Sequence, residues 1–325
     1  MLVEGVAMTA PSPDAPAHAP TVSPAGDPRS GAQPGPPTVS GTTLDEVVGL
    51  LDLDQAGPDL FQGGHTVMAG EVNHVFGGMV AAQAFVAAAR TVAAERPVHS
   101  LHNYFLRPGD PSVPLEFHVE RTRDGRSFSH RRVSAVQHGR TIAEMSCSFA
   151  LPLDGVSHQA PAPEVPAPET VRPDTEILAG LPGVHPVAPA PDAFEMRTPG
   201  LADEVVHGRR SAPGESMPVW LRATGSVGDD PVLHAALLTY ASDLHILRPV
   251  MGPHEYSTFA IDVRAASVDH AVWFHRPVPV DGWILMVNDS PWAGSGRGVA
   301  RCRVYDDAGA LVAEVAQEAL FRLPD

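Results

Sequence analysis

The sequence contains very little cysteine. Cys147 and Cys302 are the only two among 325 residues, and no Cys-x-x-Cys spacing occurs. Both lie in strand-like runs, so neither a disulfide framework nor a cysteine-bound metal is indicated. Isolated thiols of this kind are typical of small buried side chains in a reducing compartment. We therefore expect a cytoplasmic protein.

Basic residues are also scarce. The chain has 22 Lys and Arg against 38 Asp and Glu, which gives a formal net charge of -16. A general nucleic-acid surface needs a basic face, so we expect no nucleic-acid partner. Any anionic ligand would have to be held by individual arginines, because the overall field repels it.

Long hydrophobic runs and metal-ligand spacings are missing as well. No segment approaches the ~20 apolar residues of a membrane span, and the first residues lack the basic region of a secretory signal. The 16 histidines show no ligand spacing, and neither H-E-x-x-H nor G-x-S-x-G occurs. We therefore expect no membrane span, no metal, no organic cofactor and no lipase-type nucleophile.

Proline is abundant and unevenly placed. Nine of the 34 prolines lie in residues 1–42 and ten in residues 152–191, a composition typical of tails and linkers. We therefore predict a disordered tail over 1–42 and an N-terminal domain over 43–151. A linker with little regular structure over 152–192 then leads to a C-terminal domain over 193–325.

One pattern occurs twice in the two predicted domains. The segment HSLHNYFLRPGDP from His99 corresponds to VDHAVWFHRPVP from Val268. Arg107-Pro108 matches Arg276-Pro277, and Ala143-Glu144 matches Ala313-Glu314. A repeat of this length indicates a duplicated domain. Duplication allows one copy to specialise, so differences between the copies indicate where function resides.

Each copy predicts one long buried helix followed by antiparallel strands, an α+β unit built twice. In the first copy, Gly77-Gly78 opens an Ala-rich helix that runs to residue 93. Strands are expected at 100–107, 114–123, 127–137 and 140–151. In the second copy, Asp230 is expected to cap a helix that starts at Pro231. Strands of the second copy are expected at 266–276, 283–288, 298–305 and 310–322. Before the long helix of the first copy, we expect a short helix at 43–53 and short strands or loop at 59–72.

Five motifs resemble the acyl-CoA thioesterase II family in order and spacing. They are VFGGMVAAQAF, SLHNYFLRPGDPSVPLEFHVERTRDGRSFSHRRV, LLTYASDLHIL, SVDHAVWFHRPV and GRGVARCRVYDDAGALVAEVAQEAL. The resemblance implies a double hotdog fold, in which each repeat wraps an antiparallel sheet around a long central helix. It also implies hydrolysis of fatty acyl-CoA to free acid and CoA without metal or cofactor, in a homo-oligomer (dimer or tetramer).

The resemblance further implies a catalytic set of Asp243, Ser267 and Gln317, which would hold and activate a water molecule. Gly77 and Gly78 are candidates for binding substrate through a backbone N–H that donates to the oxyanion. Met79 stands where many members have Gln, and Ala82 where Gly often occurs; both departures bear on acyl preference. Arg297 is a candidate for contact with a CoA phosphate.

The residue pattern gives its own support for two of these positions. Gln317 has the parity of the apolar face of its strand, where an amide without partners costs ~1–3 kcal/mol; the counterpart in the first copy is Cys147. Asp243 adjoins the apolar stripe in the last helical turn, where the helix dipole disfavours an anion. The first-copy helix has no acidic residue. We therefore predict one active site per chain, in the second copy.

Other readings of these residues remain open. Gln317 could bond a backbone carbonyl for structure, and Asp243 could be a solvated residue at the edge of the stripe. Asp269 and His270 form an acid/His pair, which a hotdog dehydratase or hydratase would use. Adjacent strand residues point to opposite faces, so we interpret both as structural. The remaining alternative is a non-catalytic module that binds acyl-CoA.

Overall fold

The computed structural model describes residues 43–64, 74–179, 181, 192–254 and 264–322, all within one compact unit, Val39–Asp325. Three predicted regions lie wholly or partly outside these described residues. They are the tail, part of the short strands or loop at 59–72, and residues 180 and 182–191 of the linker. Among the described helices, none has the length and apolar character needed to cross a membrane.

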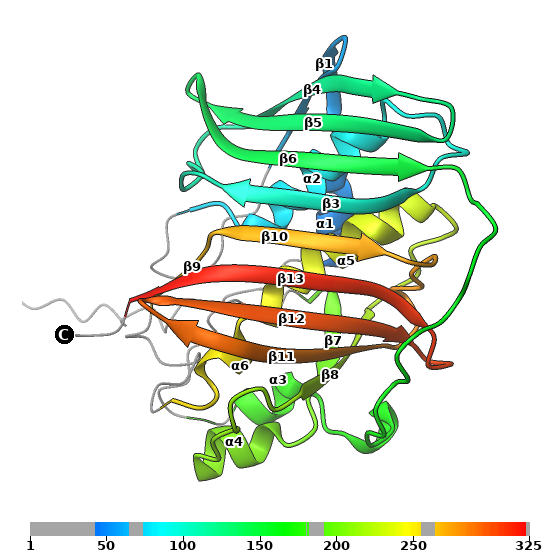
Figure 1. Cartoon of the computed structure of the whole chain (residues 1–325). Coiled ribbons are helices and arrows are strands. Elements are labelled where there is room, and N and C mark those ends of the chain that lie inside the picture. Colours follow the sequence, from blue (N-terminus) through cyan, green and yellow to red (C-terminus); the bar gives the residue numbers. More distant parts are fainter. Residues whose placement is uncertain (1–42, 65–73, 180, 182–191, 255–263, 323–325) are drawn as a thin grey trace, which may run out of the picture. The chain divides into compact units, whose positions relative to one another are not determined.

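One antiparallel sheet runs through both copies (Figure 1). The first copy contributes β1 (Asp54–Gly57), β2 (Leu60–Gly63), β3 (Val98–Phe105), β4 (Leu115–Asp124), β5 (Phe128–Gln137) and β6 (Arg140–Ala150). The second contributes β7 (Phe194–Arg197), β8 (Met217–Ala223), β9 (Arg264–Ser267), β10 (Asp269–Phe274), β11 (Ile284–Gly294), β12 (Arg297–Asp306) and β13 (Leu311–Arg322). The order is β1-β2-β4-β5-β6-β3-β10-β13-β12-β11-β8-β7, with β9 also on β13. The copies therefore join where β3 pairs with β10.

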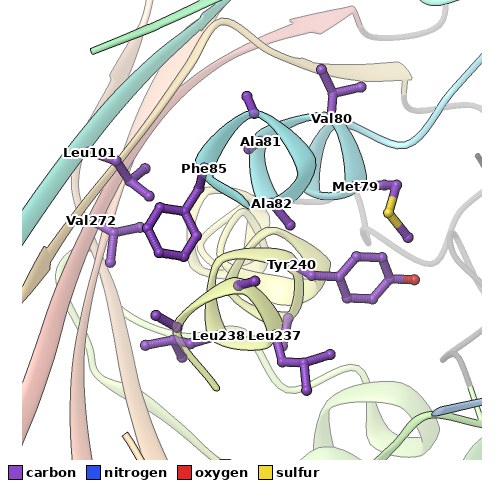
Figure 2. Close-up of a cluster of buried hydrophobic side chains, with 14 of the residues drawn as sticks. Met79, Val80, Ala81, Ala82, Phe85, Leu101, Leu237, Leu238, Tyr240 and Val272 are labelled. Carbon is purple, nitrogen blue, oxygen red and sulfur yellow. The ribbon is translucent and has the colours of Figure 1, made fainter. Parts of the chain in front are cut away.

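Two long helices lie against one side of this sheet, α2 (Gly77–Ala89) of the first copy and α5 (Pro231–His245) of the second (Figure 1). α2 is buried along almost its whole length because it consists of small and apolar residues with a single Gln and no charge. Figure 2 shows its side chains above Leu237, Leu238 and Tyr240 of α5. This pair of central helices, each enclosed by its own strands, is the predicted double hotdog fold.

Shorter helices complete the described part of the chain. α1 (Leu44–Leu51) begins at Thr43, whose side chain forms a capping box with Glu46, and α5 begins at Asp230, which accepts from the Val232 N–H at 2.9 Å. The capping box stabilises the start of α1, and the predicted cap of α5 at Asp230 is confirmed. The remaining short helices are η1 (Pro168–Thr170), α3 (Asp174–Leu178), α4 (Leu201–His207) and α6 (Arg248–Met251).

The predicted first-copy strands are confirmed to within two residues, but three other predictions need correction. The strand expected at 266–276 is two strands, β9 and β10, separated at Val268. The strand expected at 283–288 continues to Gly294 as β11. α2 ends at Ala89, before the predicted end at residue 93, because the N–H groups of Thr91 and Val92 bond three residues back and tighten the last turn.

The Pro-rich segment after β6 lies along the outer face of the second-copy sheet. The Trp220 indole N–H donates to the Pro166 carbonyl at 2.9 Å, and the Tyr305 hydroxyl donates to that of Pro161 at 3.2 Å. These contacts cover an outer apolar cluster made of Trp220, Leu285, Val287, Tyr305 and Leu311, with Ala162, Val165 and Trp283 packed against it. The segment has little regular structure, yet it is held by specific contacts.

Candidate active site

Three side chains from distant parts of the second copy meet at one point. Asp243 lies in the last turn of α5, Ser267 ends β9, and Gln317 lies in the middle of β13. Gln317 Nε2 donates to Asp243 Oδ1 and to Ser267 Oγ, both at 2.7 Å, and Ser267 Oγ donates to Asp243 Oδ1 at 3.3 Å. The structure therefore brings together the three residues that the sequence singled out.

The directions of these bonds match an ionised carboxylate. Gln317 offers only its NH2 group to Asp243, and an amide nitrogen donates without accepting. The Ser267 hydroxyl donates to the same carboxylate oxygen. Asp243 Oδ1 is thus held by two donors, whereas Oδ2 receives neither of these side-chain bonds. A carboxylate with one fixed oxygen and one oxygen left to accept can orient a water molecule.

The first copy reaches this carboxylate through the N-terminus of α2. The Gly78 N–H donates to Asp243, and a Cβ placed on Gly77 would lie 3.0 Å from Asp243 Oδ2. The N-terminus of a helix carries partial positive charge. It therefore offsets the unfavourable position of Asp243 near the C-terminal end of α5, and the site uses both copies.

The environment raises the pKa of the Asp243 carboxyl above its ordinary value. Burial is the largest cause, because the carboxyl lies among protein atoms although the residue as a whole keeps some exposure. The electrostatic effect of His270 and the hydrogen bonds from Gln317, Gly78 and Ser267 oppose this increase. A carboxylate whose pKa moves toward neutrality becomes a stronger base.

Gly78→Ala tests the close approach of α2 to α5. A Cβ at position 78 would lie 2.7 Å from the Tyr240 carbonyl oxygen, so the helices must move apart and shift the N–H away from Asp243. We expect a loss of about 1–3 kcal/mol in unfolding free energy and at least about 10-fold in kcat. Chemical denaturation and steady-state kinetics measure both. Gly49→Ala on α1, where a Cβ meets nothing within 4 Å, is the control, and equal effects in the two variants would contradict this account.

A β-bulge at Val268 places Ser267 on the inner face of the sheet. Ser267 lies opposite Ala319 and Ala271 opposite Ala316, so β9 and β10 use one residue more than β13 over this stretch. In a regular strand Ser267 and His270 would point to opposite faces. The extra residue reverses the alternation, and both side chains therefore turn toward Gln317.

His270 lies behind the cluster and is completely buried. Its Nδ1 contacts Gln317 Oε1, and its Nε2 lies 2.9 Å from the Ser242 hydroxyl. Asp269 points to the other face, where it accepts from the Glu318 N–H at 2.7 Å. The prediction that Asp269 and His270 face apart is confirmed, but sequence reasoning missed the contact between His270 and Gln317. The sequence did contain a signal for this contact. His270 is a second polar residue on the inner face of the sheet, and the cross-strand register places it beside Gln317.

The corresponding place in the first copy is apolar. Leu101 of β3 lies opposite Cys147 of β6, as His270 lies beside Gln317, and both first-copy side chains are buried. The first copy has the same kind of irregularity, between Val98 and Ser100. The duplicated framework, bulge included, is therefore present twice, whereas the polar set is present once.

The other two candidate residues, Met79 and Arg297, lie in different surroundings. Met79 is completely buried on α2 (Figure 2), one residue beyond the Gly78 N–H that contacts Asp243. Arg297 lies apart from the cluster, because it is exposed on β12 and pairs at 3.0 Å with Glu318, whose side chain alternates with that of Gln317. The loop before Arg297 is a hairpin turn, with positive φ at Ser295 and Gly296.

Family models match both halves of the chain. Residues 67–150 match the model described as acyl-CoA thioesterase N-terminal domain, and residues 162–321 match the acyl-CoA thioesterase C-terminal domain. The chain is 35% identical over 295 residues to acyl-coenzyme A thioesterase 8 of Rattus norvegicus, covering 85% of this chain and 88% of the relative. It is 34% identical over 287 residues to acyl-CoA thioesterase 2 of Haemophilus influenzae, covering 87% and 99%.

A solved structure shows the same fold. The acyl-CoA thioesterase II TesB2 of Mycobacterium marinum is 36% identical, has a TM-score of 0.71, and covers 86% of this chain and 99% of its own. A hotdog-fold protein from Alicyclobacillus acidocaldarius has a TM-score of 0.67 at 21% identity, which extends the likeness in fold alone. The matches span both copies, including the elements that carry the Asp243 cluster.

Proposed function

Because the chain belongs to the acyl-CoA thioesterase II family, we propose that it hydrolyses fatty acyl-CoA to free acid and CoA by direct attack of water. Asp243 is the general base, and Ser267 and Gln317 orient the water and the carboxylate. The single observation that carries this proposal is the convergence of Gln317 and Ser267 on Asp243 Oδ1. These two side-chain bonds hold one carboxylate oxygen, and the other oxygen accepts from the water in the proposed reaction.

In the proposed reaction, water oxygen attacks the thioester carbonyl carbon while Asp243 takes one proton from the water. The resulting tetrahedral intermediate carries negative charge on the former carbonyl oxygen. As it collapses, the carbon–sulfur bond breaks and the CoA sulfur leaves with the electron pair. The proton on Asp243 neutralises the thiolate, which yields free acid and CoA thiol and restores the carboxylate.

The oxyanion requires a donor that is not already used by the base. Of the two glycines considered from the sequence, Gly78 directs its N–H to Asp243. Gly77 occupies the first position of α2, where a backbone N–H has no partner within the helix. We assign oxyanion binding to the Gly77 N–H, which makes the first copy part of the same active site.

A thiol-release screen across acyl-CoA chain lengths tests the proposed activity. We expect stoichiometric release of CoA thiol and free acid, with a preference for certain acyl lengths. Binding of acyl-CoA without thiol release would support the non-catalytic module instead. Dehydration of a 3-hydroxyacyl-CoA without thiol release would support the dehydratase.

Asp243→Asn is expected to raise thermal stability, and more so at neutral than at acid pH. The folded-state pKa of Asp243 is raised by burial. Its contribution to stability is therefore fully present below the unfolded-state pKa and is lost as pH rises through the folded-state value. Asparagine does not titrate, so the difference in Tm, variant minus wild type, should grow as pH rises from the ordinary pKa of an aspartate through the raised pKa of Asp243. A difference that stays constant or shrinks over this range would contradict the raised pKa.

We also propose a cytoplasmic enzyme of fatty acid metabolism that forms a homo-oligomer. The two cysteines are free and buried, which supports a reducing compartment.

The proposed homo-oligomer is supported by exposed aromatic side chains. The outer face of β3 and β10 exposes Tyr104 (56%) and Trp273 (37%), and exposed aromatic side chains are typical of contact surfaces. Native mass spectrometry of the purified chain would give the number of copies.

A further inference from the structure

We propose that His270 is a positioning residue that fixes the direction of the Gln317 amide and, through it, the catalytic carboxylate. The inference rests on the proposed role of Asp243 as the general base. In this account His270 touches neither substrate nor water. It acts by determining which end of the Gln317 amide faces Asp243.

The hydrogen bonds allow one orientation of that amide. Gln317 Oε1 contacts His270 Nδ1 while Gln317 Nε2 donates to Asp243 Oδ1 at 2.7 Å. A carboxamide oxygen only accepts, so Nδ1 of His270 carries the proton of the first bond. Rotation of the amide by half a turn would place its oxygen against the carboxylate and its NH2 group against the protonated Nδ1. Both contacts would then be repulsive.

Ser242 holds the opposite side of the imidazole ring. Its hydroxyl lies 2.9 Å from His270 Nε2 and 3.2 Å from the Thr239 carbonyl oxygen, one turn earlier in α5. Ser242 directly precedes Asp243, so the helix that carries the base also anchors the ring that orients its partner. His270, Ser242 and Gln317 are all buried, and in a low-dielectric environment such a polar chain is strongly directional.

The duplication provides an internal comparison. The first copy has the same strands, a corresponding bulge and a central helix, but Leu101 and Cys147 occupy the positions of His270 and Gln317. The sheet therefore folds around this position without any polar pair. Retaining a buried His–Gln pair in the second copy costs desolvation energy that an apolar pair avoids. We attribute that cost to the orientation of Gln317.

Two polar substitutions separate orientation from general structural support. The Asn amide of His270→Asn can place a donor near the former Nδ1, facing Gln317. The longer amide of His270→Gln reaches the former Nε2 and serves Ser242 instead. We expect His270→Asn to keep kcat within about 5-fold of wild type, and His270→Gln and His270→Leu to lower kcat by about 10–100-fold. KM should change less than about 3-fold, because substrate contacts are intact.

A double-mutant cycle with Gln317→Ala shows whether His270 acts through Gln317. In that background, His270→Gln should change kcat by less than about 2-fold. His130→Leu is the control, since His130 is another strand histidine beside a serine, Ser148, at 3.2 Å, although it is only partly buried. It should leave kcat within about 2-fold.

Three results would overturn the proposal: wild-type kcat in His270→Gln, equal loss in the Asn and Gln variants, or full additivity with Gln317→Ala. The Asn and Gln variants are compared with each other, so the test does not depend on His270→Leu folding. An active Asp243→Asn variant would instead overturn the proposed function, which keeps the two failures distinct.

Discussion

Asp243→Asn is expected to lower kcat for acyl-CoA hydrolysis by about 10³–10⁴-fold. The substitution keeps the size of the side chain and removes the group that takes the proton from water. Loss of a general base typically costs about 10²–10⁴-fold, and this carboxylate also orients the nucleophile. Steady-state thiol release measures the effect, and circular dichroism shows that the fold is retained.

Asp289→Asn is the matched control for that substitution. Asp289 is a mostly buried aspartate of the second copy, on β11, where it pairs with Arg301 at 2.8 Å. It lies outside the Asp243 cluster, so kcat should stay within about 2-fold of wild type. A folded Asp243→Asn enzyme that hydrolyses acyl-CoA at near wild-type rates would show that another group activates the water.

Gln317→Ala is expected to have the second largest effect, a decrease in kcat of about 10²–10³-fold. Gln317 holds Asp243 Oδ1 and Ser267 Oγ at the same time, and removal of one preorganised donor typically costs about that factor. Rapid-quench measurement of a single turnover would show the loss in the chemical step itself.

Gln137→Ala provides the comparison for loss of a buried glutamine. Gln137 of β5 is 4% exposed and donates to the carbonyls of Asp110 and Val113. We expect this variant to lose stability, by about 1–3 kcal/mol, while retaining kcat within about 3-fold. If both glutamine variants lost the same activity, the effect would be one of packing and not of the Asp243 cluster.

Local patterns predicted the duplicated architecture well. Strand-like runs located the first-copy strands to within two residues, and Asp230-Pro231 located the start of α5. The strand parity of Gln317 correctly indicated a buried amide, since its exposure is 1%. The role of Ser267 came from resemblance to a family alone, whereas the position of Asp243 in the last helical turn gave support from the pattern as well.

The site geometry depends on contacts that local patterns do not contain. The bulge at Val268 turns Ser267 inward, yet regular alternation would place it on the face opposite His270. The Gly78 N–H reaches Asp243 only because two helices from different copies cross at a glycine. The interpretation of His270 as a structural residue did not consider Gln317, which is 47 residues away in the sequence.

The bulge also explains how a duplicated frame came to hold a single site. Both copies have a one-residue irregularity at the equivalent place, after Val98 and after Ser267. Three inward positions of the sheet then differ in polarity between the copies, and Asp243 of α5 completes the second-copy site. Val98, Leu101 and Cys147 correspond to Ser267, His270 and Gln317.

The account's central claim is that water attacks the thioester directly, with Asp243 as base and no acyl-enzyme. A single turnover with enzyme in excess, carried out in ¹⁸O-labelled water, tests it most directly. We predict that the released acid carries one ¹⁸O atom from the first turnover and that the peptide containing Asp243 remains unlabelled. An unlabelled acid together with an ¹⁸O atom in Asp243 would contradict the claim, because it would show that the carboxylate itself attacked the thioester.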